Sequence, residues 1–128
     1  MPKIDIACII DNDPIFVFGA KRIMEIADFC NSFMIFRDGK EAFDKLKTII
    51  NTDGKLPDLI LLDINMPIWN GWQFLDEFIK IPIKKSITIY IMTSSIDPID
   101  VEKAKKYNEI SNYIVKPISL DELKQLIV

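Results

Sequence analysis

The sequence predicts an α/β protein with one doubly wound, five-stranded parallel sheet that carries helices on both faces. Short, nearly continuous apolar runs alternate five times with longer segments of helical periodicity along the 128 residues. Strands this apolar are typical of parallel sheets that helices bury on both sides. The length suits a single domain, so we expect one domain over residues 1–128.

The first strand–helix unit occupies the N-terminal part of the chain. The apolar stretch IDIACII at residues 4–10 predicts a buried strand. The segment 13–29 has helical periodicity, and it begins with Asp13 and Pro14, which favour the N-cap and the first helical position. We therefore expect a helix over residues 13–29.

The second unit follows after a short connection. The stretch SFMIFR at residues 32–37 predicts a strand, and residues 38–50 predict a helix. Asp38 and Glu41 have the spacing of a capping box at the start of this helix, although Asp replaces the usual Ser or Thr.

Three further units repeat the alternation. Strands are expected at residues 57–63, 87–94 and 111–116, and helices at residues 71–80, 97–107 and 119–128. Ser119 and Glu122 have capping-box spacing at the start of the last helix. Because parallel strands are joined by right-handed crossovers, few topologies remain.

The composition excludes several classes of function. The net charge is −3 with no block of basic residues, so we expect neither nucleic acid nor a membrane as a partner. The chain has no histidine, which excludes Ser-His and Cys-His catalysis, histidine metal sites and a phosphohistidine on this chain. The N-terminus lacks signal-peptide features, and Cys8 and Cys30 lie in apolar stretches. We predict two buried free thiols in a cytoplasmic protein.

Polar residues end four of the five predicted strands. The first strand runs into Asp11 and Asn12, the third ends at Asp63, the fourth reaches Thr93 and the fifth ends at Lys116. In a doubly wound sheet the binding site lies beyond the carboxyl ends of the strands, where the strand order reverses. We therefore expect carboxylates, a hydroxyl and an amine to meet in one pocket.

This constellation resembles the receiver domain of two-component response regulators, including the single-domain chemotaxis type. The resemblance covers essentially the whole chain and rests on IIDNDP, LLDINMPIWNG, IMTSS and YIVKP, in that order. It implies a flavodoxin-like strand order of 2-1-3-4-5. It also implies a stand-alone receiver without an output domain, which is not an enzyme that turns over a free substrate.

The resemblance assigns the phosphoacceptor and the metal site. Asp63 matches the residue that accepts the phosphoryl group, and Asp11 and Asn12 match an acidic pair that holds a divalent cation. Asn65 matches the position that lends its main-chain carbonyl to the metal. A carboxylate can attack phosphorus, and a site made only of oxygen ligands suits Mg²⁺, so the chemistry agrees with the assignment.

The resemblance also assigns the residues that respond to phosphorylation. Thr93 matches the switch hydroxyl, and Tyr113 matches an aromatic switch residue, although a tyrosine there is also typical of a half-buried edge position. Lys116 matches a lysine that contacts the phosphoryl group and precedes a usually cis proline, here Pro117.

One residue departs from the family pattern. Asn12 stands where a second acid is usual, which removes one negative charge and predicts weaker binding of Mg²⁺. Asp13 is a poorer candidate for the second acid, because it precedes Pro14 and is better used as a helix cap.

The loop after Asp63 has its own expectations. We expect Pro67 and Gly71 to shape the loop, with Gly71 supplying a backbone conformation that other residues avoid. Trp69 and Trp72 flank it, and the sequence leaves open whether they shield the pocket or fill a groove.

The first helix carries more apolar side chains than a sheet can cover. The run IFVF at residues 15–18 places at least one apolar side chain outward. We expect Ile15, Phe18 and Arg22, at helical spacing, to form part of a docking patch for the phosphodonor. The alternative is that they pack under a neighbouring helix.

These features predict transfer of a phosphoryl group from a sensor histidine kinase or a phosphotransfer protein to Asp63, and a downstream protein that reads the change. The first alternative is a pseudo-receiver that only binds partners, which Asn12 supports. A flavin-binding protein is disfavoured by the acidic loop DNDP after the first strand. An aspartyl phosphatase is disfavoured because the nucleophile motif Asp-x-Asp is replaced by DIN.

Overall fold

The structure is a computed structural model that describes residues 2–94 and 97–126. Its strands are β1 (Ile4–Ile10), β2 (Cys30–Phe36), β3 (Leu59–Asp63), β4 (Thr88–Thr93) and β5 (Ile110–Val115). Its helices are α1 (Pro14–Ile26), α2 (Gly39–Asn51), α3 (Gly71–Phe78), α4 (Pro98–Ala104) and α5 (Leu120–Gln125).

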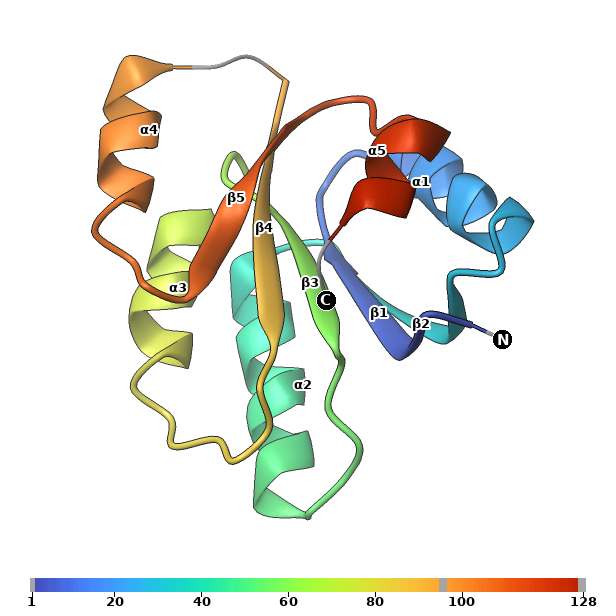
Figure 1. The fold of residues 1–128 in the computed structure, drawn as a ribbon. Coiled ribbons are helices and arrows are strands. Elements are labelled where there is room, and N and C mark those ends of the chain that lie inside the picture. The colour runs from blue at the N-terminus through green and yellow to red at the C-terminus, as the bar shows by residue number, and fades with distance from the viewer. Residues whose placement is uncertain (1, 95–96, 127–128) are drawn as a thin grey trace.

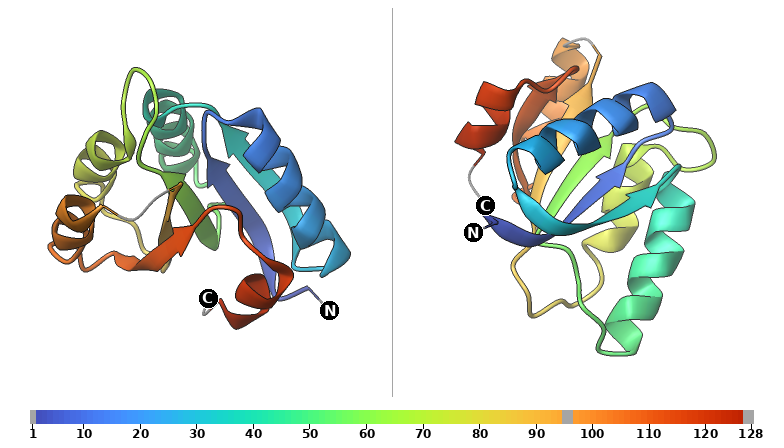
Figure 2. Two further views of the ribbon diagram at one scale, coloured as in Figure 1. Left: turned by 90° about the horizontal axis from the view of Figure 1, so that it is seen from above. Right: turned by 90° about the vertical axis from the view of Figure 1, so that its right-hand side faces the viewer.

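The strands form one parallel sheet in the order β2-β1-β3-β4-β5. Helices α1 and α5 cover one face, and α2, α3 and α4 cover the other (Figures 1 and 2). The two hydrophobic clusters of the core lie on these two faces. The predicted α/β fold class and the strand order 2-1-3-4-5 are confirmed.

The first helix is shorter than predicted. Instead of continuing to residue 29, α1 ends at Ile26 because Asp28 adopts a left-handed conformation with φ of 51°. The N–H groups of Phe29 and Asp28 then donate to the carbonyls of Met24 (2.9 Å) and Glu25 (3.1 Å). This arrangement is a Schellman motif with Asp where glycine is usual. The sequence held no glycine to mark the end, and β2 consequently begins two residues earlier than predicted.

Helix α2 ends at Asn51, one residue later than predicted, whereas α3, α4 and α5 end earlier than predicted. In α5 both hydrogen bonds of the predicted Ser119–Glu122 capping box are present. In α3 a capping box between Asn70 and Gln73 fixes the start, and its spacing is present in the sequence. Residues 127–128 of the predicted last helix lie outside the described residues.

The core is apolar and mostly aliphatic. Every residue of β3 is buried, as expected for the central strand of a sheet covered on both faces. Both thiols are free: Cys8 is buried as predicted, whereas Cys30 is only partly buried because β2 is an edge strand. Among the described residues, no helix has the length and apolar character needed to cross a bilayer.

Candidate functional site

The register of the sheet brings the predicted strand-end residues together. Ile10 of β1 pairs with Leu62 of β3, so the residues that follow them, Asp11 and Asp63, lie side by side. On the other side of β3, Asp63 itself pairs with Met92, directly before Thr93. Thr93 in turn pairs with Val115, directly before Lys116. The predicted convergence is therefore a consequence of register.

Two buried carboxylates form the centre of the site. Asp11 and Asp63 are both buried, and each uses one oxygen to hold its own loop. Oδ1 of Asp11 accepts from the N–H of Asp13 at 2.8 Å, and Oδ1 of Asp63 accepts from the N–H of Asn65 at 3.2 Å. The Oδ2 atom of each carboxylate takes no part in these loop hydrogen bonds.

The Lys116 ammonium faces both of these oxygens. Its Nζ lies 2.7 Å from Oδ2 of Asp11 and 3.6 Å from Oδ2 of Asp63. It also lies 4.6 Å from the centroid of the Phe16 ring, whose face favours a cation. Lys116 thus places one positive charge against two negative ones in a largely dry site. The peptide bond between Lys116 and Pro117 is cis, as the resemblance implied.

The Asp63 carboxylate has a perturbed pKa. Burial, reinforced by the negative charge of Asp11, raises the pKa of Asp63 to about 6, and the Lys116 ammonium opposes this rise. An extra negative charge in this pocket is therefore costly unless a cation enters with it.

Strand alternation places the charged groups and the two predicted switch residues, Thr93 and Tyr113, on different faces of the sheet. Alternate residues of a strand point to opposite faces of the sheet, and Leu61 belongs to the core under α1 and α5, whereas Ile91 belongs to the core under α2, α3 and α4. Asp63 therefore points to the α1 side, and Thr93 points to the α4 side. Tyr113 also packs on the α4 side, is half-buried, and donates its hydroxyl proton to the carbonyl of Asp100 in α4.

The donor set fits a hard divalent cation. Oδ2 of Asp11 is buried, and its ion-pair partner is the Lys116 ammonium at 2.7 Å. Oδ2 of Asp63 faces the same ammonium. The side chains of Asn12 and Asn65 are exposed beside the two acids. Within residues 2–94 and 97–126, no three acidic, cysteine or histidine side chains gather into a metal cluster, so a cation here would complete its shell with amide oxygen, carbonyl or water.

Asp13 serves as the helix cap, as we expected. Its Oδ1 accepts from the N–H groups of Ile15 and Phe16, at 3.0 and 3.3 Å. The alternative in which Asp13 acts as the second acid of the metal site gains no support.

The expectation for Gly71 is corrected by the loop geometry. No described glycine has a positive φ; the left-handed residue of this loop is Ile68, with φ of 66°. Gly71 is required instead for space, because a Cβ there would lie 2.7 Å from the carbonyl oxygen of Asp63 and 2.8 Å from Cα of Ile64. The start of α3 thus lies against the backbone of Asp63 and Ile64.

The two tryptophans of this loop have different neighbours. Trp69 packs against α2, with its ring 5.3 Å from that of Phe43 and 5.1 Å from Nζ of Lys40. Trp72 is buried between α3 and α4, where its indole stacks on Tyr107 at 5.6 Å. Both side chains therefore pack against residues of neighbouring elements. The sequence did not predict the contact with α4, because Trp72 and its partners are far apart in the chain.

The predicted docking patch lies on the surface. Ile15 is 83% exposed and Phe18 is 74% exposed, and Arg22 is exposed one turn further along α1. The alternative, in which these side chains pack under a neighbouring helix, is wrong. Ile15 lines a hollow that also includes Lys116, so the patch adjoins the site.

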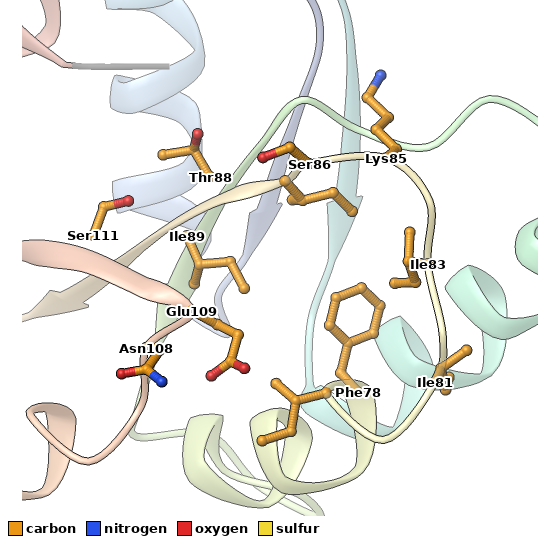
Figure 3. A pocket seen from close by; sticks show the side chains of 12 residues that line it. Phe78, Ile81, Ile83, Lys85, Ser86, Thr88, Ile89, Asn108, Glu109 and Ser111 are labelled. Atoms are coloured by element: carbon orange, nitrogen blue, oxygen red, sulfur yellow. The ribbon is translucent and has the colours of Figure 1, made fainter.

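Another hollow lies at the opposite end of the sheet. Figure 3 shows Phe78, Ile89 and Glu109 around it, at the starts of β4 and β5. Because Asp63 stands at the carboxyl end of β3, this hollow belongs to a different part of the molecule.

Comparison with known proteins gives one consistent family. A sequence model of the response regulator receiver domain matches residues 7–128. The chain is 28% identical over 106 residues to the probable methanogenesis regulatory protein FilR2 of Methanothrix harundinacea strain 6Ac, which covers 83% of this chain and 68% of FilR2. It is 31% identical over 93 residues to the transcriptional regulatory protein CiaR of Streptococcus pneumoniae, which covers 72% of this chain but only 40% of CiaR.

Solved structures agree with the sequence relatives. The crystal structure of a two-component response regulator from Cytophaga hutchinsonii superposes with a TM-score of 0.86 at 31% identity, covering 95% of this chain and 92% of that one. A two-component response regulator from Legionella pneumophila superposes with a TM-score of 0.78 at 27% identity, covering 96% and 94% of the two chains.

Proposed function

This chain belongs to the response regulator receiver domain family, and on that basis we propose that it accepts a phosphoryl group on Asp63. The observation that carries the proposal is the convergence of Asp11, Asp63 and Lys116, with both free carboxylate oxygens facing one ammonium. The donor is a sensor histidine kinase or a histidine phosphotransfer protein. The chain supplies no histidine, so the phosphohistidine must come from the partner.

The proposed step is an in-line displacement. An oxygen of the Asp63 carboxylate attacks the phosphorus of the partner's phosphohistidine, a P–O bond forms and the P–N bond breaks. The imidazole leaves with the electron pair and takes up a proton. Lys116 compensates charge on the phosphoryl oxygens. Thr93, at the end of the neighbouring strand β4, would turn towards the phosphoryl group to donate a hydrogen bond.

We propose that Mg²⁺ supports this step. The residues that would hold it are Asp11, Asn12 and Asp63, with the main-chain carbonyl of Asn65. When bound, the cation neutralises part of the charge that accumulates as the phosphoryl group meets two buried carboxylates. The raised pKa of Asp63 supports the need for such a cation, since burial and Asp11 disfavour its charged form. The Lys116 ammonium contacts Oδ2 of Asp11, one of the oxygens that would hold the cation.

The partner is proposed to dock on α1. Ile15 and Phe18 present exposed apolar side chains beside the site, and Arg22 extends the patch with a charge. A helical bundle that carries a phosphohistidine could pack its apolar side chains against this patch while its histidine reaches Asp63.

The output is proposed to be a change in protein binding, or relay of the phosphoryl group to another carrier. Phosphorylation would shift a two-state equilibrium that involves Thr93 and Tyr113 on the α4 side. The chain would act as a signalling protein that turns over no free substrate. The two free thiols agree with a cytoplasmic setting.

Intact-protein mass after incubation with Mg²⁺ and acetyl phosphate tests the proposal. A single phosphoryl adduct is expected on the wild type, and none on Asp63→Asn or after chelation of the metal. A wild type that gains no adduct and binds no Mg²⁺ would instead support the pseudo-receiver.

A further inference from the structure

Helix α4 is held by few side chains. It has seven residues, and of these only Ala104 is buried. An element that buries so little apolar surface has low local stability, so its position depends on the individual contacts that it makes.

One of those contacts comes from Trp72 at the start of α3. The indole N–H donates to Oδ1 of Asp100 in α4 at 3.2 Å. The same ring stacks on Tyr107, with an interplanar angle of 21°, and lies 5.2 Å from Nζ of Lys103. Figures 1 and 2 show α3 and α4 side by side on this face of the sheet.

Asp100 also joins this contact to the switch tyrosine. Its carboxylate accepts from Trp72, and its main-chain carbonyl accepts from the hydroxyl of Tyr113 in β5. Trp72 and Tyr113 therefore hold the same residue of α4 from two different elements.

The other end of this connection is the acceptor itself. The N–H of Gly71 donates to the carbonyl of Ile64 at 3.2 Å, and no Cβ fits between Gly71 and the Asp63 backbone. Trp72 is the next residue. A shift of the Asp63 backbone must consequently move the N-terminus of α3, and the indole with it.

We propose that Trp72 is a positioning residue that couples the Asp63 loop to α4 and Tyr113 through Asp100. This coupling rests on the proposed role of Asp63 as the phosphoacceptor. The Trp72–Asp100 hydrogen bond is made in the unphosphorylated state and weakens when Asp63 is phosphorylated, which releases α4. The bond can bias the equilibrium only through this difference between the two states.

Matched variants of the chain isolate the coupling. Trp72→Phe keeps an aromatic ring but removes the donor, and Trp69→Phe makes the same change in the tryptophan that contacts α2 instead. Asp100→Ala removes the acceptor, whereas Asp100→Asn removes the charge but keeps an oxygen that can accept. Asp100 is only half-buried, so its variants should fold even if Trp72→Phe does not.

Hydrogen exchange of the amides in residues 98–104 is measured with and without Mg²⁺ and beryllofluoride. In Trp72→Phe and Asp100→Ala, the amides of α4 should exchange about fivefold faster than in the wild type without beryllofluoride, as expected for loss of one hydrogen bond. Addition of beryllofluoride should change their exchange rates less than it does in the wild type. Both variants should also take up phosphoryl groups from acetyl phosphate severalfold faster, which a merely structural residue would not produce. Trp69→Phe and Asp100→Asn should resemble the wild type.

Each contrary outcome has a definite meaning. If the wild type gains the adduct but α4 exchanges equally in all variants, the coupling is overturned and the acceptor role stands. If Trp69→Phe loosens α4 as much as Trp72→Phe does, the effect is general and the coupling is likewise overturned. If the wild type gains no adduct and binds no Mg²⁺, the acceptor role fails, and the coupling fails with it.

Discussion

The Lys116 ammonium lies closer to Asp11 than to Asp63, the proposed phosphoacceptor. The distances from Nζ to Oδ2 are 2.7 Å and 3.6 Å. Oδ2 of Asp11 is buried, and the Lys116 ammonium is its ion-pair partner. Lysine and a metal ion would therefore compete for the same atom, and cation binding should draw Asp11 away from Lys116.

Removal of Lys116 should strengthen Mg²⁺ binding. In Lys116→Gln both carboxylates lose their resident positive charge, so we expect the affinity for Mg²⁺ to rise by about tenfold, or about 1.4 kcal/mol. Phosphoryl uptake from acetyl phosphate should nevertheless fall. Calorimetric titration with Mg²⁺ measures the affinity, and Lys45→Gln, which changes the charge equally on the exposed face of α2, is the control. An unchanged affinity in Lys116→Gln would contradict the competition.

Introduction of a second acid at position 12 should also strengthen Mg²⁺ binding. Asn12 stands beside Asp11 with an exposed side chain, and Asn12→Asp adds a negative charge at the mouth of the site. We expect Asn12→Asp to bind Mg²⁺ several-fold more tightly, because a hard cation gains a charged oxygen ligand. The same titration measures it. If Asn12→Asp shows no gain, Asn12 is not a ligand of the cation.

The charged centre could be predicted from the sequence because it depends on the sheet alone. Asp11 and Lys116 directly follow β1 and β5, Asp63 and Thr93 end β3 and β4, and the carboxyl ends of parallel strands meet at one edge. Their approach needs only the strand order and the register. The predicted cap at Asp13 is also local, since its partners lie two and three residues further along.

The features that the sequence did not reveal depend on distant or unusual contacts. Trp72 and Asp100 lie 28 residues apart, and no local pattern relates them. The end of α1 was misplaced because Asp28 takes the left-handed conformation in which glycine is usual. The same conformation at Ile68 was attributed to Gly71, since glycine adopts it at lower cost.

Truncation of Phe18 should weaken docking of the phosphodonor protein without changing the phosphorylation chemistry at Asp63. Its side chain is 74% exposed, so Phe18→Ala should leave stability and phosphorylation by acetyl phosphate unchanged. Transfer from a phosphotransfer partner that loads the wild type should slow by about tenfold, as for loss of an aromatic anchor. The control is Ile99→Ala, which removes an equally exposed apolar side chain from α4. Equal transfer rates for wild type and Phe18→Ala would rule out this docking surface.

Ile68 should be a source of strain. It is β-branched, has φ of 66° and is 74% exposed, so little packing offsets its conformation. Ile68→Gly should raise the free energy of unfolding by about 0.5–1 kcal/mol. This gain is the difference between two effects: relief of the left-handed strain stabilises the folded state, and the greater freedom of glycine stabilises the unfolded chain. Urea denaturation measures this change. Ile68→Val keeps the β-branch and should gain nothing, so equal gains in both variants would argue against strain at Ile68.

Asp58 ties together the end of the sheet that lies away from the site. Its Oδ2 accepts from the N–H groups of Asp5 and Ile6, each at 3.0 Å, and its Oδ1 lies 2.7 Å from Nζ of Lys85. Partial burial opposes ionisation, but Lys85 and the two N–H groups outweigh it and hold the pKa of Asp58 below its usual value.

Loss of the Asp58 carboxylate should make stability less sensitive to acid. The pKa of Asp58 is lower in the folded than in the unfolded protein, so the charged carboxylate stabilises the folded state. This stabilisation is fully present above the unfolded-state pKa of about 4 and is lost as the pH falls through the folded-state pKa. Asp58→Asn should therefore be less stable than the wild type by about 1–2 kcal/mol at pH 7, with the gap narrowing towards pH 3. Urea denaturation at both pH values measures the gap. The control is Asp44→Asn, which removes an exposed carboxylate paired with Lys40 and should cost little at either pH. A gap for Asp58→Asn that stays constant between pH 7 and pH 3 would show that the charged form contributes nothing.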